Sequence, residues 1–149
     1  MIKEPTRFEQ RIGDYMETMQ LSLEERKTVW GKLACHKSLI GRTVKDVFLC
    51  NGAPANSQSQ SLWVFTSDVA SELRSGDSQL DIDFANHRDI QYVKLTARES
   101  DLFSVGENSS MTVCVSYTGG HASNLTARGK NCLQLMIMFK KYFSRHMSP

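Results

Sequence analysis

Residues 62–84, LWVFTSDVASELRSGDSQLDIDF, decide the fold of this chain. The stretch contains three short runs with the length of strands, at 62–66, 69–74 and 79–84, of which the first is rich in β-branched and aromatic residues. Ser67-Asp68 and Ser75-Gly76-Asp77 separate these runs at the distances typical of hairpins. Since connections this short join antiparallel neighbours, the stretch predicts three consecutive strands of an antiparallel sheet.

The last of these runs alternates strictly between apolar and acidic residues, from Leu80 to Phe84. Successive strand residues point to opposite faces, so the pattern predicts that the apolar residues point inward while Asp81 and Asp83 face the solvent. Two carboxylates with His87 nearby are also a pattern that can hold a metal or perform acid–base chemistry. The alternation explains both aspartates without such a site, and we therefore expect an exposed strand face.

Further strands are expected on both sides of this stretch, in runs rich in β-formers at 44–50, 89–97 and 111–117. The segment 53–61 contains proline, asparagine, serine and glutamine and predicts a loop. No helical period interrupts the strands, so the chain from 43 to 117 predicts an antiparallel meander of about six strands. The glycine-rich stretch 117–129 then serves as the connection to a final helix.

The first forty residues have the period of helices. Their apolar residues follow steps of three and four, at Phe8, Ile12, Tyr15, Met16, Met19 and Leu23. Pro5 suits the first turn of this helix, where its missing N–H would have no partner anyway. Ser22 and Glu25 form a capping box that predicts the start of a second helix, and Gly41 ends the helical region.

The final helix is expected at roughly 130–147, with two adjacent apolar stripes. The main stripe, which we expect to close the sheet and to be almost fully buried, consists of Cys132, Leu135, Met136, Phe139 and Phe143. The second stripe consists of Leu133, Ile137 and Tyr142. Two stripes are more apolar surface than one sheet face needs. Either the helix is sandwiched between the sheet and the N-terminal helices, or part of it is an interface.

These patterns predict an α+β fold. Residues 1–41 are expected to form an N-terminal helical extension of two helices packed on the sheet. Residues 42–149 are expected to form a curved antiparallel sheet, or partial barrel, of about six to seven strands with the C-terminal amphipathic helix packed across it. A chain of 149 residues has the size of one domain, so both parts are expected in one structural unit.

Composition is typical of a globular protein, with 40% hydrophobic and 23% charged residues. The N-terminus carries charges where a secretory signal needs an apolar run, and no stretch approaches the ~20 apolar residues that span a bilayer. The four cysteines are widely spaced, which predicts reduced, mostly buried thiols. We expect a cytoplasmic location, and association with the cytoskeleton or a membrane stays open.

Charge is distributed unevenly along the chain. Residues 47–107 hold four basic and nine acidic residues, whereas residues 108–149 hold five basic residues and no acidic one. The predicted strands carry the aromatic residues Trp63, Phe65, Tyr92 and Tyr117. RNA-binding sheets use such rings for stacking, but an acidic sheet repels phosphate. We therefore expect these rings to pack in the core and do not expect nucleic acid as a partner.

No catalytic motif can be identified. Cys35 and His36 are neighbours in a predicted helix and point about 100° apart, which does not suit a nucleophile and its base. Gly119-Gly120-His121 lacks the strand and helix that frame a dinucleotide loop. We expect a protein that is not an enzyme and that holds neither a metal nor a cofactor.

The strand rhythm of residues 62–67, 80–84 and 89–93, closed by one C-terminal amphipathic helix, resembles the pleckstrin-homology-like superfold, which includes the GRAM domains. Residues 90–93 and the helix end at 139–148 are also similar in spacing to polo boxes, which consist of six strands and a helix. Both resemblances cover about residues 43–148. They imply an interaction domain, because folds of this kind host many binding functions.

The function expected from the sequence is non-catalytic protein–protein interaction, as an adaptor, a scaffold or a subunit of a larger complex. The candidate partner-binding residues are Ile137, Lys140, Lys141, Tyr142 and Arg145. The partner is another protein, whose identity the sequence does not give. The alternative is a module that binds an anionic lipid, a phosphate group or a phosphopeptide through the basic C-terminal third.

Overall fold

The computed structural model describes residues 4, 6–51, 61–76 and 78–144. These residues form an α+β fold with two antiparallel sheets, which confirms the predicted fold class. One sheet has the order β1-β2-β3-β4 and the other the order β5-β6-β7. Their bounds are Asp46–Leu49, Leu62–Phe65, Val69–Gly76 and Gln79–Asn86 for β1 to β4, and Ile90–Ala97, Ser110–Tyr117 and Ala122–Arg128 for β5 to β7.

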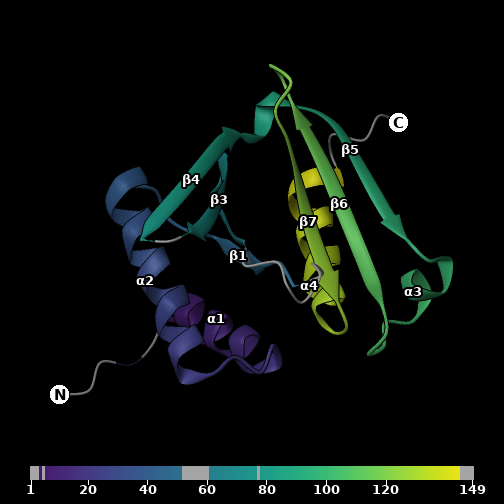
Figure 1. Cartoon of the computed structure of the whole chain (residues 1–149), viewed down its shortest axis with the longest axis horizontal. Coiled ribbons are helices and arrows are strands. Elements are labelled where there is room, and N and C mark those ends of the chain that lie inside the picture. The colour runs from purple at the N-terminus through teal and green to yellow at the C-terminus, as the bar shows by residue number, and fades with distance from the viewer. Residues whose placement is uncertain (1–3, 5, 52–60, 77, 145–149) are drawn as a thin grey trace.

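The two sheets are the walls of a V (Figure 1). They meet where β4 passes into β5 through the short helix η1 (His87–Asp89). The expected single curved sheet is therefore divided at this corner. At the other end of the V, the chain after β1 reaches β7, where the backbone N–H of Asn51 donates to the carbonyl of Thr126 at 3.1 Å.

Two elements were not predicted from the sequence. β7 lies within the glycine-rich stretch 117–129, whose buried residues Ser123, Leu125 and Ala127 include only one large apolar side chain and so give a weak strand signal. The other is α3 (Glu99–Phe103), one turn of helix between β5 and β6. The remaining strands lie within a few residues of their expected positions.

The N-terminal helices are α1 (Arg7–Thr18) and α2 (Leu23–Ile40). The capping box is confirmed: Ser22 Oγ accepts from the Glu25 N–H at 3.1 Å, and the Glu25 carboxylate accepts from the Ser22 N–H at 3.0 Å. Gly41 ends α2 with φ of 70°, a left-handed conformation that favours glycine. The assignment of Leu23 to the first apolar stripe is wrong, because Leu23 begins α2 and is 70% exposed. Pro5 lies outside the described residues.

One face of the four-stranded sheet packs against α1 and α2. This cluster is built from helix and strand residues together: Ile12, Met16, Val29, Leu33, Val47, Leu49, Leu62, Val64 and Leu73. Leu80 and Ile82 of β4 also pack there as expected. Phe84 follows on the same face but is 64% exposed, because it lies beyond the area that the helices cover, so its expected inward position is wrong.

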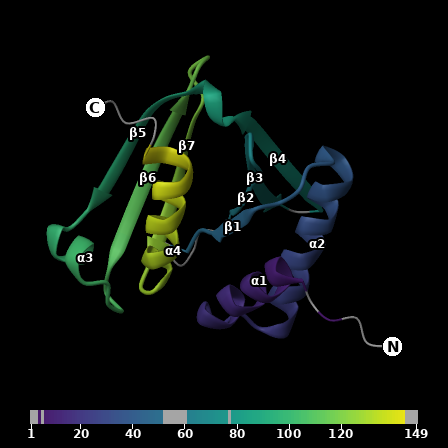
Figure 2. The same ribbon diagram turned by 180° about the vertical axis from the view of Figure 1, so that it is seen from behind.

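The opposite face of this sheet packs against the three-stranded sheet and the final helix. That helix is α4 (Asn131–Met138), which continues as a π-helix, η2 (Phe139–Phe143). Figure 2 shows α4 between the two sheets, in front of β6. The expected continuation beyond 144 lies outside the described residues. None of the helices in the described ranges combines the length and apolar composition of a bilayer-spanning segment.

Candidate functional site

The predicted partner-binding residues lie in three different environments. Ile137 is 53% exposed and Lys140 is exposed, as a binding role requires. Lys141 is half-exposed and its ammonium contacts Asp46 at 2.9 Å. Tyr142 is buried, with 6% of its surface exposed, so its expected position outside the core is wrong. Arg145 lies outside the described residues.

Tyr142 is buried because both its ring and its hydroxyl find partners. The ring stacks on Phe65 with centroids 4.5 Å apart and on His87 at 5.3 Å. The hydroxyl donates to the carboxylate of Asp46. Burial, followed by this hydrogen bond, raises the pKa of Tyr142 well above its usual range, so the phenol stays protonated.

Asp46 connects the final helix to α1. It is 4% exposed and accepts hydrogen bonds from both Tyr142 and Lys141. The guanidinium of Arg11, on α1, lies 3.6 Å away. A buried carboxylate needs such donors, because burial of an ion without them costs several kcal/mol. Removal of one partner from a buried ion pair lowers stability by about 3–5 kcal/mol. Asp46 therefore pairs with both Arg11 and Lys141.

Side chains from α1 and α4 close the free edge of β1. The Asn131 amide donates to the Leu49 carbonyl at 2.7 Å, and the Gln134 amide donates to the Val47 carbonyl at 3.0 Å. The hydroxyl of Tyr15 accepts from the Leu49 N–H at 2.9 Å and donates to Asn131 at 2.6 Å. An exposed strand edge is a template for pairing with another chain. Here that template is occupied, so a partner cannot add a strand to β1.

A groove of about 370 Å³ lies between α1 and α4, beside this closed edge. Leu133 and Ile137 stand one helical turn apart on its α4 side, with 51% and 53% of their surfaces exposed. Lys130 and Arg11 add positive charge to the lining, and Asp14 on α1 adds a negative charge. We call the two apolar residues, Leu133 and Ile137, the α4 ridge. Such a pair, rimmed by charge, is suited to bury apolar side chains of another molecule.

The surface combines residues that the sequence analysis identified with others that it missed. Leu133 belonged to the second apolar stripe but was not chosen as a site residue. Asn131 and Gln134 were missed, because nothing local in the sequence indicates that their amides reach a strand more than eighty residues earlier. The only feature of the sequence that could have indicated them is their position between apolar residues of the helix.

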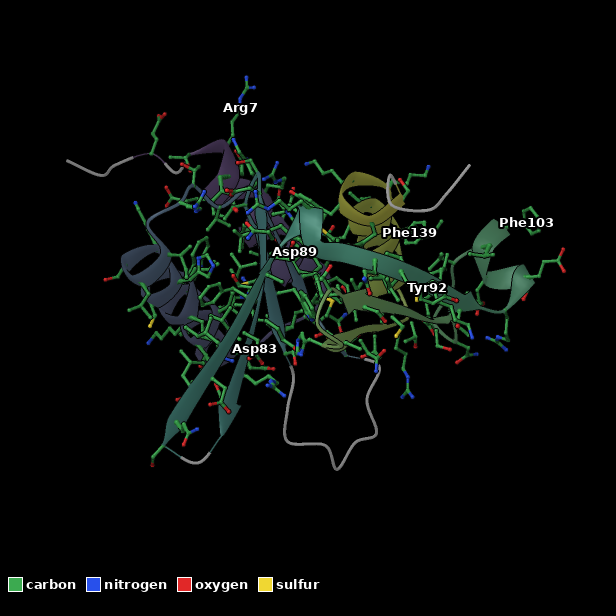
Figure 3. All side chains as sticks on the ribbon, turned by 90° about the horizontal axis from the view of Figure 1, so that it is seen from above. Arg7, Asp83, Asp89, Tyr92, Phe103 and Phe139 are labelled. Carbon is green, nitrogen blue, oxygen red and sulfur yellow. The ribbon has the colours of Figure 1, made fainter. Side chains whose placement is uncertain are left out.

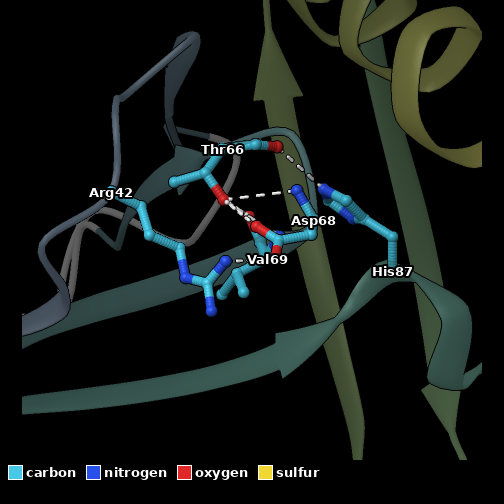
Figure 4. A network of polar contacts seen from close by, with 5 residues as sticks. All are labelled: Arg42, Thr66, Asp68, Val69 and His87. Carbon is cyan, nitrogen blue, oxygen red and sulfur yellow. Dashed lines mark hydrogen bonds and ion pairs between the residues drawn. The ribbon is translucent and has the colours of Figure 1, made fainter.

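The candidate acid–base group of the β4 region does not converge. Asp83 contacts Arg74 at 2.5 Å and Asp81 accepts from Gln79 at 2.8 Å, both on the surface. His87 is buried and its Nε2 lies 3.1 Å from the Thr66 carbonyl (Figure 4). Within the described ranges, no group of three or more histidine, cysteine or acidic side chains is arranged to hold a metal ion.

The strand aromatics divide between core and surface. Trp63, Phe65 and Tyr117 are buried between the sheets, as expected. The expectation is wrong for Tyr92, which is 57% exposed. Figure 3 shows Tyr92 and Phe103 on the side of the molecule away from the N-terminal helices. Phe103 is 83% exposed and, with Leu102 at 42%, makes a second exposed apolar pair, on α3.

Comparison with known protein families, with curated protein sequences and with solved structures found no match to this chain.

Proposed function

We propose that this protein is a non-catalytic protein–protein interaction module, an adaptor or a subunit of an intracellular complex, and that it binds its partner through the α4 ridge. The observation that carries the proposal is the exposure of Leu133 and Ile137 on a helix whose other side is anchored in the core. An apolar pair held by a rigid element loses little conformational entropy when it is covered, which favours binding.

The chemistry of the groove indicates which kind of partner segment fits. Because the edge of β1 is closed by side chains, the groove takes side chains and not an added strand. Asp14 and Asp46 line the groove together with Arg11, Lys130 and Lys141, and Asp46 already pairs with Arg11 and Lys141. Lys130 forms no ion pair within the described residues, so the expected partner segment is an amphipathic helix with apolar residues one turn apart and an acidic residue beside them.

The resemblance to the pleckstrin-homology-like superfold is part of this proposal. The meander of strands closed by one C-terminal helix supports it, because that order is the one on which the resemblance rests. Such folds serve many binding functions, so the resemblance supports an interaction domain and does not identify the ligand.

The rival function is binding of an anionic lipid or a phosphate group by the basic C-terminal third. Lys141 is a weak candidate for that role, since Asp46 already neutralises it. Lys130 and Lys140 are exposed and form no ion pair within the described residues. They are the residues whose charge reversal tests the rival without disturbing Asp46.

A comparative capture experiment tests the proposal. The wild-type chain, Leu133→Ser/Ile137→Ser and the matched control Leu102→Ser/Phe103→Ser are immobilised and exposed to the same native lysate. We expect a protein that the wild type and the control retain and that the ridge variant loses. Equal retention by all three baits contradicts the proposal.

Co-sedimentation with phosphoinositide-containing vesicles examines the rival. We expect no binding that depends on Lys130 and Lys140. Salt-sensitive binding that is lost in Lys130→Glu/Lys140→Glu supports the rival and contradicts the proposed function.

A further inference from the structure

A larger cleft, of about 660 Å³, crosses the edge of β4 between the end of α2 and the β6–β7 hairpin. Asp83 and Phe84 line it from β4, and Tyr117 and His121 line it from the hairpin. Toward the interior of the V lies a narrow recess of about 10 Å³. It is lined by the same four residues together with Trp63 and Glu72. We call this inner part the intersheet recess. It is remote in sequence from the α4 ridge and independent of the proposed function.

Glu72 places a negative charge at the intersheet recess. It lies on β3 opposite Trp63, and both residues face the interior of the V. Glu72 is partly buried and makes neither a hydrogen bond nor an ion pair with any residue that the structure describes. A carboxylate in this position, without a donor, is destabilising unless a ligand or water supplies one.

Tyr117 faces the same recess. It is 4% exposed, and its ring stacks on His121 with centroids 5.8 Å apart. Its hydroxyl has no hydrogen-bond partner in the described part of the chain. Burial, followed by the charge of Glu72, raises the pKa of Tyr117 to about 12. The phenol therefore stays neutral and offers an oxygen that can accept a hydrogen bond.

The indole of Trp63 completes the wall of the recess. It is 2% exposed, and its Nε1 has no hydrogen-bond partner among the described residues. The neighbouring Cys50 thiol is at most a weak acceptor, because burial raises its pKa to about 11 and keeps it protonated. The recess thus combines aromatic side chains with the unpaired carboxylate of Glu72.

We propose that the intersheet recess binds a primary alkylammonium group. Aromatic faces attract a cation, and Glu72 and the Tyr117 hydroxyl supply acceptors for its N–H groups. The free space of about 10 Å³ is close to that of one water molecule, which suits a primary ammonium and excludes a quaternary one. The wider cleft outside accommodates the alkyl chain and whatever carries it.

The surrounding charges agree with a cationic ligand. Asp89 lines the outer cleft, and its carboxylate forms no ion pair within the described ranges. Arg42, the only Lys or Arg side chain in the described lining of this cleft, is bound to Asp68 (Figure 4). An incoming ammonium therefore meets unpaired negative charge and a neutralised guanidinium.

Tryptophan fluorescence tests the proposal on the full chain. The protein has two tryptophans, so the Trp30→Phe background leaves Trp63 as the reporter. The probe is n-butylammonium chloride, and n-butanol and tetramethylammonium chloride are the controls. We expect a saturable change of fluorescence with n-butylammonium alone. Glu72→Gln should weaken binding by about tenfold, the loss expected for one charged hydrogen bond.

Two further variants keep the test decisive. Asp81→Asn removes an exposed carboxylate of β4 outside the cleft and should leave binding unchanged. Tyr117→Phe removes only the hydroxyl and should weaken binding even if Glu72→Gln does not fold. Equal affinity of n-butylammonium for the wild type and for a folded Glu72→Gln or Tyr117→Phe overturns the proposal. So does an equal response to n-butanol.

The ammonium group can belong to a free amine or to a lysine side chain, and the same assay distinguishes the two. The peptide probe is acetyl-Gly-Lys-Gly-amide. Tighter binding of this peptide than of n-butylammonium, sensitive to Glu72→Gln, identifies a lysine of another protein as the ligand. Tighter binding of n-butylammonium identifies a small amine. Absence of a response to both probes overturns the proposal.

Discussion

Asp46 and Tyr142 illustrate how single residues connect distant parts of this chain. The carboxylate of Asp46 is buried at the edge of the four-stranded sheet, and the hydroxyl of Tyr142 donates to it from the final helix. The ring of Tyr142 stacks on Phe65 in the same position. Because the ring packs on Phe65 and the hydroxyl donates to Asp46, burial of Tyr142 is favourable despite its polar group.

Replacement of Tyr142 with Phe should lower the free energy of unfolding by ~1–3 kcal/mol. The ring contacts are kept, but Asp46 loses a buried hydrogen-bond donor. Urea unfolding measures the loss. Ile137→Ser, on the exposed ridge, is the control and should change stability by no more than about 0.5 kcal/mol. Comparable losses in both variants contradict this account of the core.

His36 is a buried titratable residue of α2. It is fully buried, and its Nε2 lies 2.9 Å from the Ser71 hydroxyl. Burial lowers the pKa of His36 below its usual 6.5. The unfolded chain therefore binds this proton more readily than the folded protein. The contribution of neutral His36 to stability is complete above pH 6.5 and is lost as the pH falls toward the folded-state pKa.

We accordingly expect the wild type to lose stability between about pH 7.5 and about pH 5.5. In His36→Gln, which cannot titrate, the loss over the same interval should be smaller. Urea midpoints of both proteins at the two pH values measure the difference. Groups other than His36 contribute equally to both proteins, so identical pH slopes would contradict a buried neutral His36.

At the scale of elements, the final helix shows which residues of its two predicted apolar stripes are buried. The predicted main stripe is correct for Cys132, Leu135 and Phe143, which are fully buried. Met136 and Phe139 are only partly buried, and Met138 takes their place in the core. The buried face is therefore displaced toward Met138 and Tyr142, while Leu133 and Ile137 of the second stripe stay exposed. The widened turn of η2 buries both Tyr142 and Phe143.

This displacement predicts different costs for two phenylalanines of the same turn. Phe143→Ala should cost ~3–5 kcal/mol, because the side chain is fully buried and its removal leaves a cavity. Phe139→Ala should cost less, ~0.5–3 kcal/mol, because part of its surface already meets solvent. Thermal melts of the two variants provide the comparison. A larger loss for Phe139→Ala would mean that the helix faces the sheets with its predicted stripe.

At the scale of the whole molecule, the four-stranded sheet is covered on both faces. Its inner face packs on the second sheet and α4, and its outer face packs on α1 and α2. All four residues of β1 and all four of β2 are buried as a result. The N-terminal helices thus share a core with the strands.

Removal of residues 1–41 should prevent cooperative folding. The truncated chain would expose the apolar outer face of the sheet, including Val47, Leu62 and Leu73, and would lose the Tyr15 hydroxyl that satisfies Leu49. Far-UV circular dichroism during heating, together with binding of a hydrophobic dye, tests this. A sharp transition without dye binding would show that residues 42–149 fold alone.

Local patterns in the sequence were sufficient for the fold class and for most elements. The alternation in residues 79–84, the Ser22–Glu25 capping box and Gly41 act through neighbours a few residues away, so their consequences can be derived without a tertiary structure. β7 was missed because small and polar residues dominate its alternation, and the local signal for a strand is weak there.

The candidate surfaces depended on the tertiary structure. Tyr142 donates its buried hydroxyl to Asp46, which lies 96 residues earlier in the chain. Glu72 and Tyr117 likewise line one recess only because the corner folds one sheet onto the other. Whether a side chain is buried depends on the surface that packs over it. In this protein that surface comes from distant segments, so only the packed structure decides which residues remain exposed to bind.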